Sequence, residues 1–175
     1  VVALLLCTSD ADVNTQNNDR WTPLHVACWE GTLEMVELLT NSGADLNILN
    51  GEGRTPLHLA SCYHRVEIAK HLLEKNAVNV NAVDTNGCTS LHLASEGSFY
   101  RTEKETNMVL LLLENGANSN AQSKDGCTPL HVATQNEQDD FEVARILLNY
   151  GGANQLIKNR QGDIPMHLAC RRTAH

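Results

Sequence analysis

Residues 20–31 read RWTPLHVACWEG, and the tetrapeptide TPLH inside this stretch decides how the rest of the chain is interpreted. TPLH recurs at residues 55–58 and 128–131, and the variants TSLH and IPMH stand at 89–92 and 164–167. Successive copies are separated by 33, 34, 39 and 36 residues. Self-similarity at this period is typical of a solenoid, in which each unit stacks on its neighbours.

Each copy contains residues that begin and end short helices. Thr22 is a good N-cap, and Pro23 suits the first helical position because its missing N–H would be unpaired there anyway. The His three residues after Thr, which is His25 in the first copy, can share a local hydrogen bond with this cap. A Leu-rich run follows and ends near a Gly such as Gly43, where a left-handed residue stops the helix. The sequence therefore predicts units made of a helix, a tight turn, a second helix and an extended turn.

These units resemble the ankyrin repeat, and the resemblance covers the whole chain. It implies a mainly α-helical repeat solenoid, in which L-shaped units with paired antiparallel helices and a projecting β-hairpin stack into a curved array. It also implies a non-catalytic protein–protein interaction scaffold that needs no cofactor. The contacts would lie on the concave surface formed by the hairpins and the first helices.

We predict a single ankyrin-repeat domain over residues 1–175. Its complete repeats are expected at residues 19–51, 52–85, 86–124 and 125–160. The third of them carries an insertion at residues 97–106, between its helices. Residues 1–18 are interpreted as the second helix and exit loop of a partial repeat, and residues 161–175 as another partial repeat. Further ankyrin repeats or flanking domains are therefore expected in the parent chain.

Composition limits the partners that the chain can bind. Its net charge is −8, with only 13 Lys and Arg, so neither nucleic acid nor an anionic membrane surface is an expected partner. No segment approaches the 18 or so apolar residues of a membrane span, so direct membrane insertion is not expected. None of the six cysteines forms a C-x-x-C motif, and free thiols favour a reducing compartment. We expect an intracellular protein, in the cytoplasm or the nucleus.

Positions that differ between the copies carry the prediction of a binding site. Trp21 and Arg54 stand just before their TPLH motifs, and Trp29 and Tyr63 follow just beyond the small residues of the same helices. In the ankyrin pattern these positions face the concave side, and Trp, Tyr and Arg are the residue types that dominate interface energies. These four residues are the predicted partner-binding site. The alternative is that Trp29 or Tyr63 merely packs against the neighbouring unit.

Arg20 departs from the repeat at a turn position. The other copies have Gly at the equivalent positions, which are Gly53, Gly87, Gly126 and Gly162. We therefore expect a strained or remodelled turn at Arg20, next to Trp21.

Catalytic and metal sites are not predicted. Five of the eight histidines belong to the repeat motif, and stacked units about 8–10 Å apart cannot bring them to one zinc ion. Cys28 follows His25 by three residues and lies on the same side of the helix, but its equivalents are Ser61, Ser95 and Thr134, with Cys170 in the last unit. A small residue at this position is a packing requirement, so the His–Cys pair is not interpreted as a nucleophile and its base.

The family resemblance also implies one modification. Ankyrin arrays resemble targets of asparaginyl β-hydroxylation in the loop that leaves the second helix, and Asn14 and Asn47 match this pattern well. Asn81 and Asn120 match it less closely. The structural alternative is that these side chains hydrogen-bond the loop backbone.

A second function remains open beside protein binding. The chain could serve as an architectural spacer or regulatory ankyrin array within a larger membrane-associated, cytoskeletal or enzyme-linked protein. The repeat pattern identifies no particular partner, because the scaffold residues are shared and the binding residues vary.

Overall fold

The computed structural model describes residues 12–75, 77–96, 103–135 and 141–172, and within these ranges the chain forms nine helices and no β-strand. The first helices of successive units are α2 (Pro23–Glu30), α4 (Pro56–Cys62), α6 (Ser90–Ala94), α8 (Pro129–Gln135) and α10 (Pro165–Arg172). The second helices are α3 (Leu33–Asn41), α5 (Val66–Leu73), α7 (Glu103–Glu114) and α9 (Glu142–Asn149).

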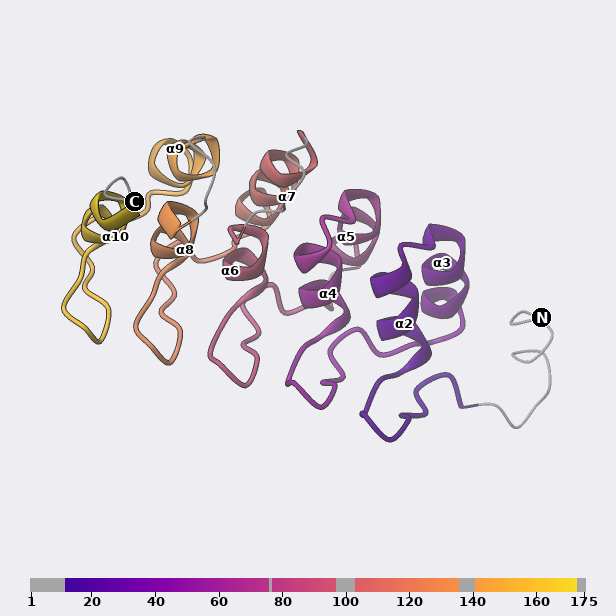
Figure 1. Ribbon diagram of the computed structural model, residues 1–175. Coiled ribbons are helices and arrows are strands. Elements are labelled where there is room, and N and C mark those ends of the chain that lie inside the picture. The colour runs from indigo at the N-terminus through magenta and orange to yellow at the C-terminus, as the bar shows by residue number, and fades with distance from the viewer. Residues whose placement is uncertain (1–11, 76, 97–102, 136–140, 173–175) are drawn as a thin grey trace.

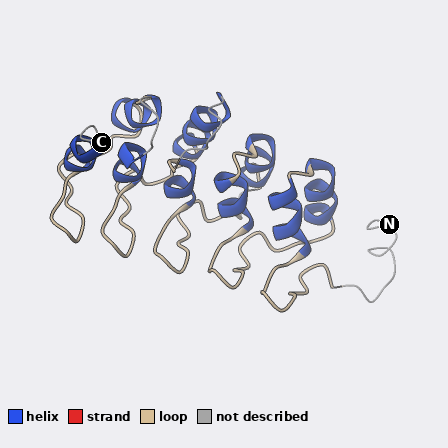
Figure 2. Cartoon of the chain, viewed as in Figure 1, coloured by secondary structure: helices blue, strands red, loops and turns tan. Residues whose placement is uncertain are grey.

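The helices form two rows that run the length of the molecule (Figure 1). The first helices make one row, the second helices make the other, and long loops project from the first row away from the second (Figures 1 and 2). From α2 to α8, each first helix packs on the second helix of its unit and on the first helix of the next, as α2 does on α3 and α4. We call the surface formed by the projecting loops and the first helices the loop surface. The predicted helical solenoid is confirmed.

A Thr and a His begin the first helices of four units. In α2 the Thr22 N–H donates to Nδ1 of His25 at 3.2 Å, and the His25 N–H donates to Oγ1 of Thr22 at 3.4 Å. This capping box confirms the predicted local hydrogen bond. Because Nδ1 accepts, Nε2 carries the proton and donates to the carbonyl of Arg54 at 3.0 Å. The equivalent histidines of the next three units make the same hydrogen bond from Nε2 to a carbonyl of the following loop. They are His58 to Cys88, His92 to Cys127 and His131 to Asp163.

Small residues allow adjacent first helices to pack closely. Ala27 and Cys28 in α2 are 4% and 0% exposed, and Ala60 and Ser61 in α4 are fully buried. Burial also raises the pKa of the Cys28 thiol, so that it remains protonated. Large apolar residues such as Leu91 fill the space between the two helix rows. Cys28 is therefore a core residue, as the repeat pattern predicts.

The projecting loops contain no β-strand within the described residues, which corrects the β-hairpins implied by the resemblance. Each loop doubles back through two backbone hydrogen bonds, such as those from the Asn50 N–H to the Arg54 carbonyl and from the Gly53 N–H to the Asn50 carbonyl, both at 3.0 Å. Neighbouring loops are joined by a single backbone bond, for example from the Gly51 N–H to the Asp19 carbonyl at 2.9 Å. One bond per pair of loops is too few for a strand ladder. We refer to these segments as hairpin loops.

Several predicted segments extend beyond the described residues. Within the predicted insertion, residues 97–102 lie outside them, and residues 103–106 form the beginning of α7. Most of the predicted partial repeat at the N-terminus, residues 1–11, also lies outside them. No helix in the described part of the chain is long and apolar enough to cross a bilayer.

Candidate protein-binding surface

The two tryptophans lie against each other on the loop surface of the first unit. Trp21 precedes the cap of α2, and Trp29 lies in the last turn of that helix. Their ring centroids are 5.9 Å apart at an interplanar angle of 84°, which is an edge-to-face contact. Trp21 also contacts the ring of His25, and its side chain is half-buried against the core, whereas Trp29 is 41% exposed. Trp21 is thus fixed in position and supports a more exposed neighbour.

Arg54 is held between two hairpin loops. Its Nη1 lies 3.1 Å from Oε2 of Glu52 in its own loop, and its Nε lies 3.7 Å from Oδ2 of Asp84 in the next loop. The Asp84 side chain is only 2% exposed, and its other carboxylate oxygen accepts the N–H groups of Asn86 and Cys88. The second ion pair is too long for a hydrogen bond, and Nε is buried without a hydrogen-bond partner in the described part of the chain. Arg54 therefore stands in a fixed position with its charge largely balanced.

Tyr63 ends α4, and its side chain is 46% exposed. Aromatic contacts within the described residues join Trp21 to Trp29 and to His25, but they do not include Tyr63. The structure thus brings the two tryptophans together and places Tyr63 apart from them, one unit further along.

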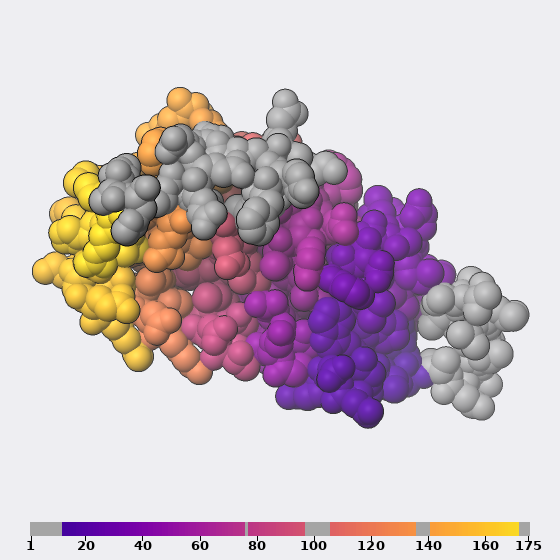
Figure 3. Space-filling model, viewed as in Figure 1, coloured from indigo at the N-terminus to yellow at the C-terminus, as the bar shows by residue number. Residues whose placement is uncertain are grey.

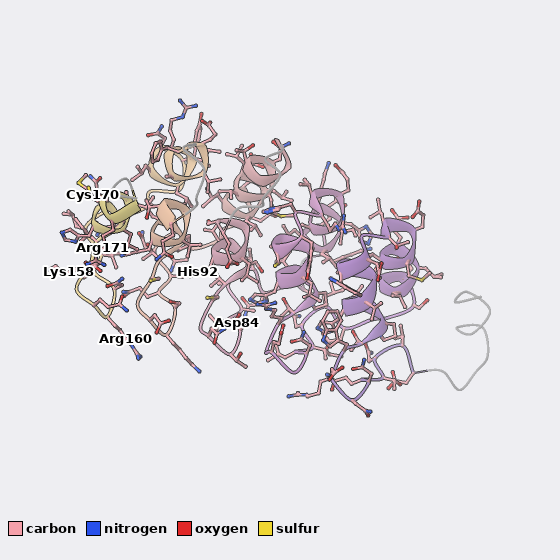
Figure 4. All side chains as sticks on the ribbon, viewed as in Figure 1. Asp84, His92, Lys158, Arg160, Cys170 and Arg171 are labelled. Carbon is pink, nitrogen blue, oxygen red and sulfur yellow. The ribbon has the colours of Figure 1, made fainter. Side chains whose placement is uncertain are left out.

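The last unit has a different pair at the two positions that the tryptophans occupy in the first. These positions hold Asp163 and Arg171, whose side chains form two hydrogen bonds of 2.7 and 3.0 Å (Figure 4 labels Arg171). This pair was not predicted from the sequence. The sequence does contain an indication of it, because Asp163 and Arg171 have the same separation of eight residues across the helix cap as Trp21 and Trp29.

Arg20 adopts the left-handed backbone conformation that the repeat pattern gives to Gly. Its φ is +61°, and the equivalent Gly53 has φ +72°. A Cβ built on Gly53 would lie 2.9 Å from the backbone nitrogen of Thr85 in the next loop, so that position also needs Gly for space. In the loop that follows Arg20, the position equivalent to Thr85 is Gly51, which has no side chain. The turn is strained as predicted, but it is not remodelled.

The candidate hydroxylation sites connect successive exit loops. The Asn14 side chain donates to the Gly43 carbonyl at 3.4 Å and accepts the Asp45 N–H at 2.8 Å. The Asn47 side chain donates to the Ala77 carbonyl at 2.7 Å and accepts a backbone N–H at 3.0 Å. Asn81 and Asn120 make the same pair of bonds to the units that follow them. The structural role that was the alternative interpretation is therefore present at all four positions.

The thiols of the loop surface are poorly suited to nucleophilic chemistry. Burial is the main cause that raises the pKa of the Cys62, Cys88 and Cys127 thiols, and that of Cys88 reaches about 11. All three thiols are free, and protonated thiols are weak nucleophiles and weak metal ligands. No group of three or more His, Cys, Asp or Glu side chains among the described residues is arranged to hold a metal ion.

The two helix rows, the single backbone hydrogen bond between neighbouring hairpin loops and the repeated Thr–His cap define a helical repeat solenoid. Three overlapping matches to a family model described as ankyrin repeats (3 copies) cover residues 1–84, 42–120 and 99–175. The chain therefore belongs to the ankyrin-repeat family, whose members are generally non-catalytic modules for protein–protein interaction. A search of curated proteins returned no match.

Proposed function

We propose that the protein binds another protein through its loop surface and that Trp21, Trp29, Arg54 and Tyr63 anchor the contact. The observation that carries this proposal is the edge-to-face tryptophan pair, in which a supported Trp21 presents a Trp29 that is 41% exposed. An aromatic ring that is already fixed loses little conformational entropy on binding. At the position equivalent to Trp29, the next three units have Cys62, Glu96 and Gln135. The first unit therefore offers the partner a distinct surface.

A photo-crosslinking residue placed at Tyr63 tests this proposal, with the same residue at Tyr150 as the matched control. Tyr150 is 77% exposed and ends α9 in the second helix row, away from the loop surface (Figure 1). A partner on the loop surface should be captured from Tyr63 and not from Tyr150. Equal capture from both positions would contradict the proposal.

Alanine variants then measure the contribution of the tryptophans to binding of the captured partner. Trp29→Ala should weaken binding by about 30-fold, which corresponds to about 2 kcal/mol at an interface hot spot, and Tyr150→Ala should leave it unchanged. Helical content measured by circular dichroism should stay constant. If Trp21→Ala/Trp29→Ala unfolds the array, the two rings are core residues and the proposed site is wrong.

We propose an architectural or regulatory array within a larger protein as the second candidate. The supporting observation is that the described units stack through contacts with their immediate neighbours, as α4 packs on α2 and α6. Arrays of this kind are extended by further stacked units. The free thiols and the acidic composition are compatible with an intracellular location for either function.

We also propose that Asn47, and Asn14 with it, can be β-hydroxylated. Asn47 is exposed in its loop, and its two bonds to the next unit use the side-chain amide, not the β-carbon. Mass spectrometry of peptides from the protein isolated from its own cells should show the gain of one oxygen on these residues. Complete absence of this gain on both residues would overturn the proposal.

A further inference from the structure

We infer that a hollow beside Trp21 receives a lysine or arginine side chain of the partner, so that the partner segment bound at this end of the array is basic. The inference rests on the proposed function and specifies the chemistry of the partner. The hollow is lined by Asn18, Asp19, Arg20, Trp21, Gly51 and Glu52.

The hollow lies between the tips of the first two described hairpin loops. The Gly51 N–H donates to the Asp19 carbonyl at 2.9 Å and fixes the two loops side by side. Trp21 forms one wall, and its backbone N–H donates to Oδ1 of Asn17 at 2.8 Å. The ring of Trp21 also contacts the ring of Trp29, which does not line the hollow. The walls are therefore rigid before any partner binds.

Gly51 keeps the hollow open. Its φ lies outside the left-handed region, so the backbone conformation does not require Gly here. A Cβ at this position would lie only 3.0 Å from the Asp19 carbonyl oxygen. The loops that follow make the same backbone hydrogen bond from Thr85, Lys124 and Arg160, all of which have side chains. The large indole ring of Trp21 and the missing side chain of Gly51 thus occur side by side at one end of the array.

The charges around the hollow favour a cation. The residues that line it include two with carboxylate side chains, Asp19 and Glu52, and one cationic residue, Arg20. The Asp19 carboxylate forms no ion pair with any described residue, and Glu52 remains 59% exposed although it pairs with Arg54. An indole ring binds ammonium and guanidinium groups, and adjacent carboxylates strengthen this attraction.

The charge of the array is also uneven along its length. Residues 12–96 contain eleven Asp and Glu against five Lys and Arg, whereas residues 141–172 contain two against five. Lys158, Arg160 and Arg171 mark the basic end in Figure 4, opposite the end that carries the hollow. A basic segment is therefore attracted toward the first units before any close contact forms.

Intrinsic fluorescence tests the inference directly, because Trp21 and Trp29 are the only two tryptophans in the chain. Three blocked peptides without aromatic residues are titrated into the protein, one of Gly and Arg, one of Gly and Glu, and one of Gly and Gln. The Gly-Arg peptide should change the fluorescence, and the change should weaken as NaCl is added. An equal or larger response to the Gly-Glu peptide would overturn the inference, as would a response to all three.

Charge variants identify the hollow as the place of binding. Asp19→Asn should weaken Gly-Arg binding by about two- to five-fold, and Arg20→Gln should strengthen it. Glu67→Gln makes the same charge change at an exposed position on α5 and should have no effect, so equal loss in Asp19→Asn and Glu67→Gln contradicts the inference. Gly51→Ala should weaken binding by filling the hollow, and circular dichroism checks that it folds.

The two proposals fail in different ways. If crosslinking at Tyr63 captures a partner whose binding depends on Trp29 while the Gly-Arg peptide gives no response, the inference fails and the proposed function stands. If crosslinking shows no preference for the loop surface, the proposed function fails whatever the peptides do.

Discussion

At the scale of single residues, the molecule departs from its own repeat at few positions. Arg20 is the clearest, since it holds a left-handed φ of +61° that costs an L-residue free energy and that Gly adopts freely. The strained residue, Arg20, lines the hollow beside Trp21. Strained residues persist where the surrounding structure enforces them, and they concentrate at functional sites.

Arg20→Gly should raise the free energy of unfolding by up to about 1 kcal/mol, because it removes this backbone strain. Urea unfolding measures the effect as a higher midpoint with an unchanged slope. Arg20→Ala keeps a Cβ at the same φ and should give no gain. An equal gain in both variants would mean that the Arg20 side chain, and not its backbone, destabilises the fold.

At the scale of helices and loops, short elements depend on their neighbours. The five residues of α6 cannot form a stable helix alone, but Leu91, Leu93 and Ala94 within it are nearly completely buried. The His92 side chain connects this helix to the next hairpin loop through the Cys127 carbonyl. Stability at this scale therefore comes from contacts between units.

Leu91→Ala should lower the free energy of unfolding by about 2–5 kcal/mol, because the fully buried side chain leaves a cavity between the helix rows. Leu148→Ala on α9 is the matched control, since that side chain is 41% exposed and should contribute little. Chemical denaturation of both variants tests the expectation. Similar losses in the two would show that burial does not decide which leucines stabilise the array.

At the scale of the whole molecule, the motif histidines connect the units into one acid-sensitive array. Burial is the largest cause that lowers the pKa of His25, His58 and His92 below the usual 6.5. In the unfolded chain these side chains take up protons near that value. Their contribution to stability is therefore fully present above about pH 6.5 and is lost as the pH falls toward their folded pKa.

The free energy of unfolding should accordingly decrease between pH 7.5 and 5.5, roughly the range in which histidine titrates. His92→Gln should be less stable at pH 7.5 and should show a shallower decrease, because one titrating group is gone. His71 is partly exposed on α5 and is not one of the motif histidines, so His71→Gln serves as the control that keeps the full slope. Identical slopes in all three proteins would contradict the role of the buried histidines.

The sequence by itself determined the repeated architecture, because the same physical requirements recur in every unit. Thr22 and Pro23 are favoured where a helix begins, a small residue at Cys28 is needed where helices pack closely, and Gly is preferred where φ is positive. These requirements act over a few residues, so the pattern displays them directly. It also indicated Trp21 and Trp29 as unusual members of the series.

Only the tertiary structure decided how the unusual residues meet. The placement of Arg54 between Glu52 and Asp84, and the opening between Trp21 and Gly51, depend on contacts between loops about 30 residues apart in the chain. The same is true of the bonds from Asn47 to the next exit loop. A periodic sequence specifies how units stack, but which side chains remain exposed depends on the residue that the neighbouring unit places opposite each of them.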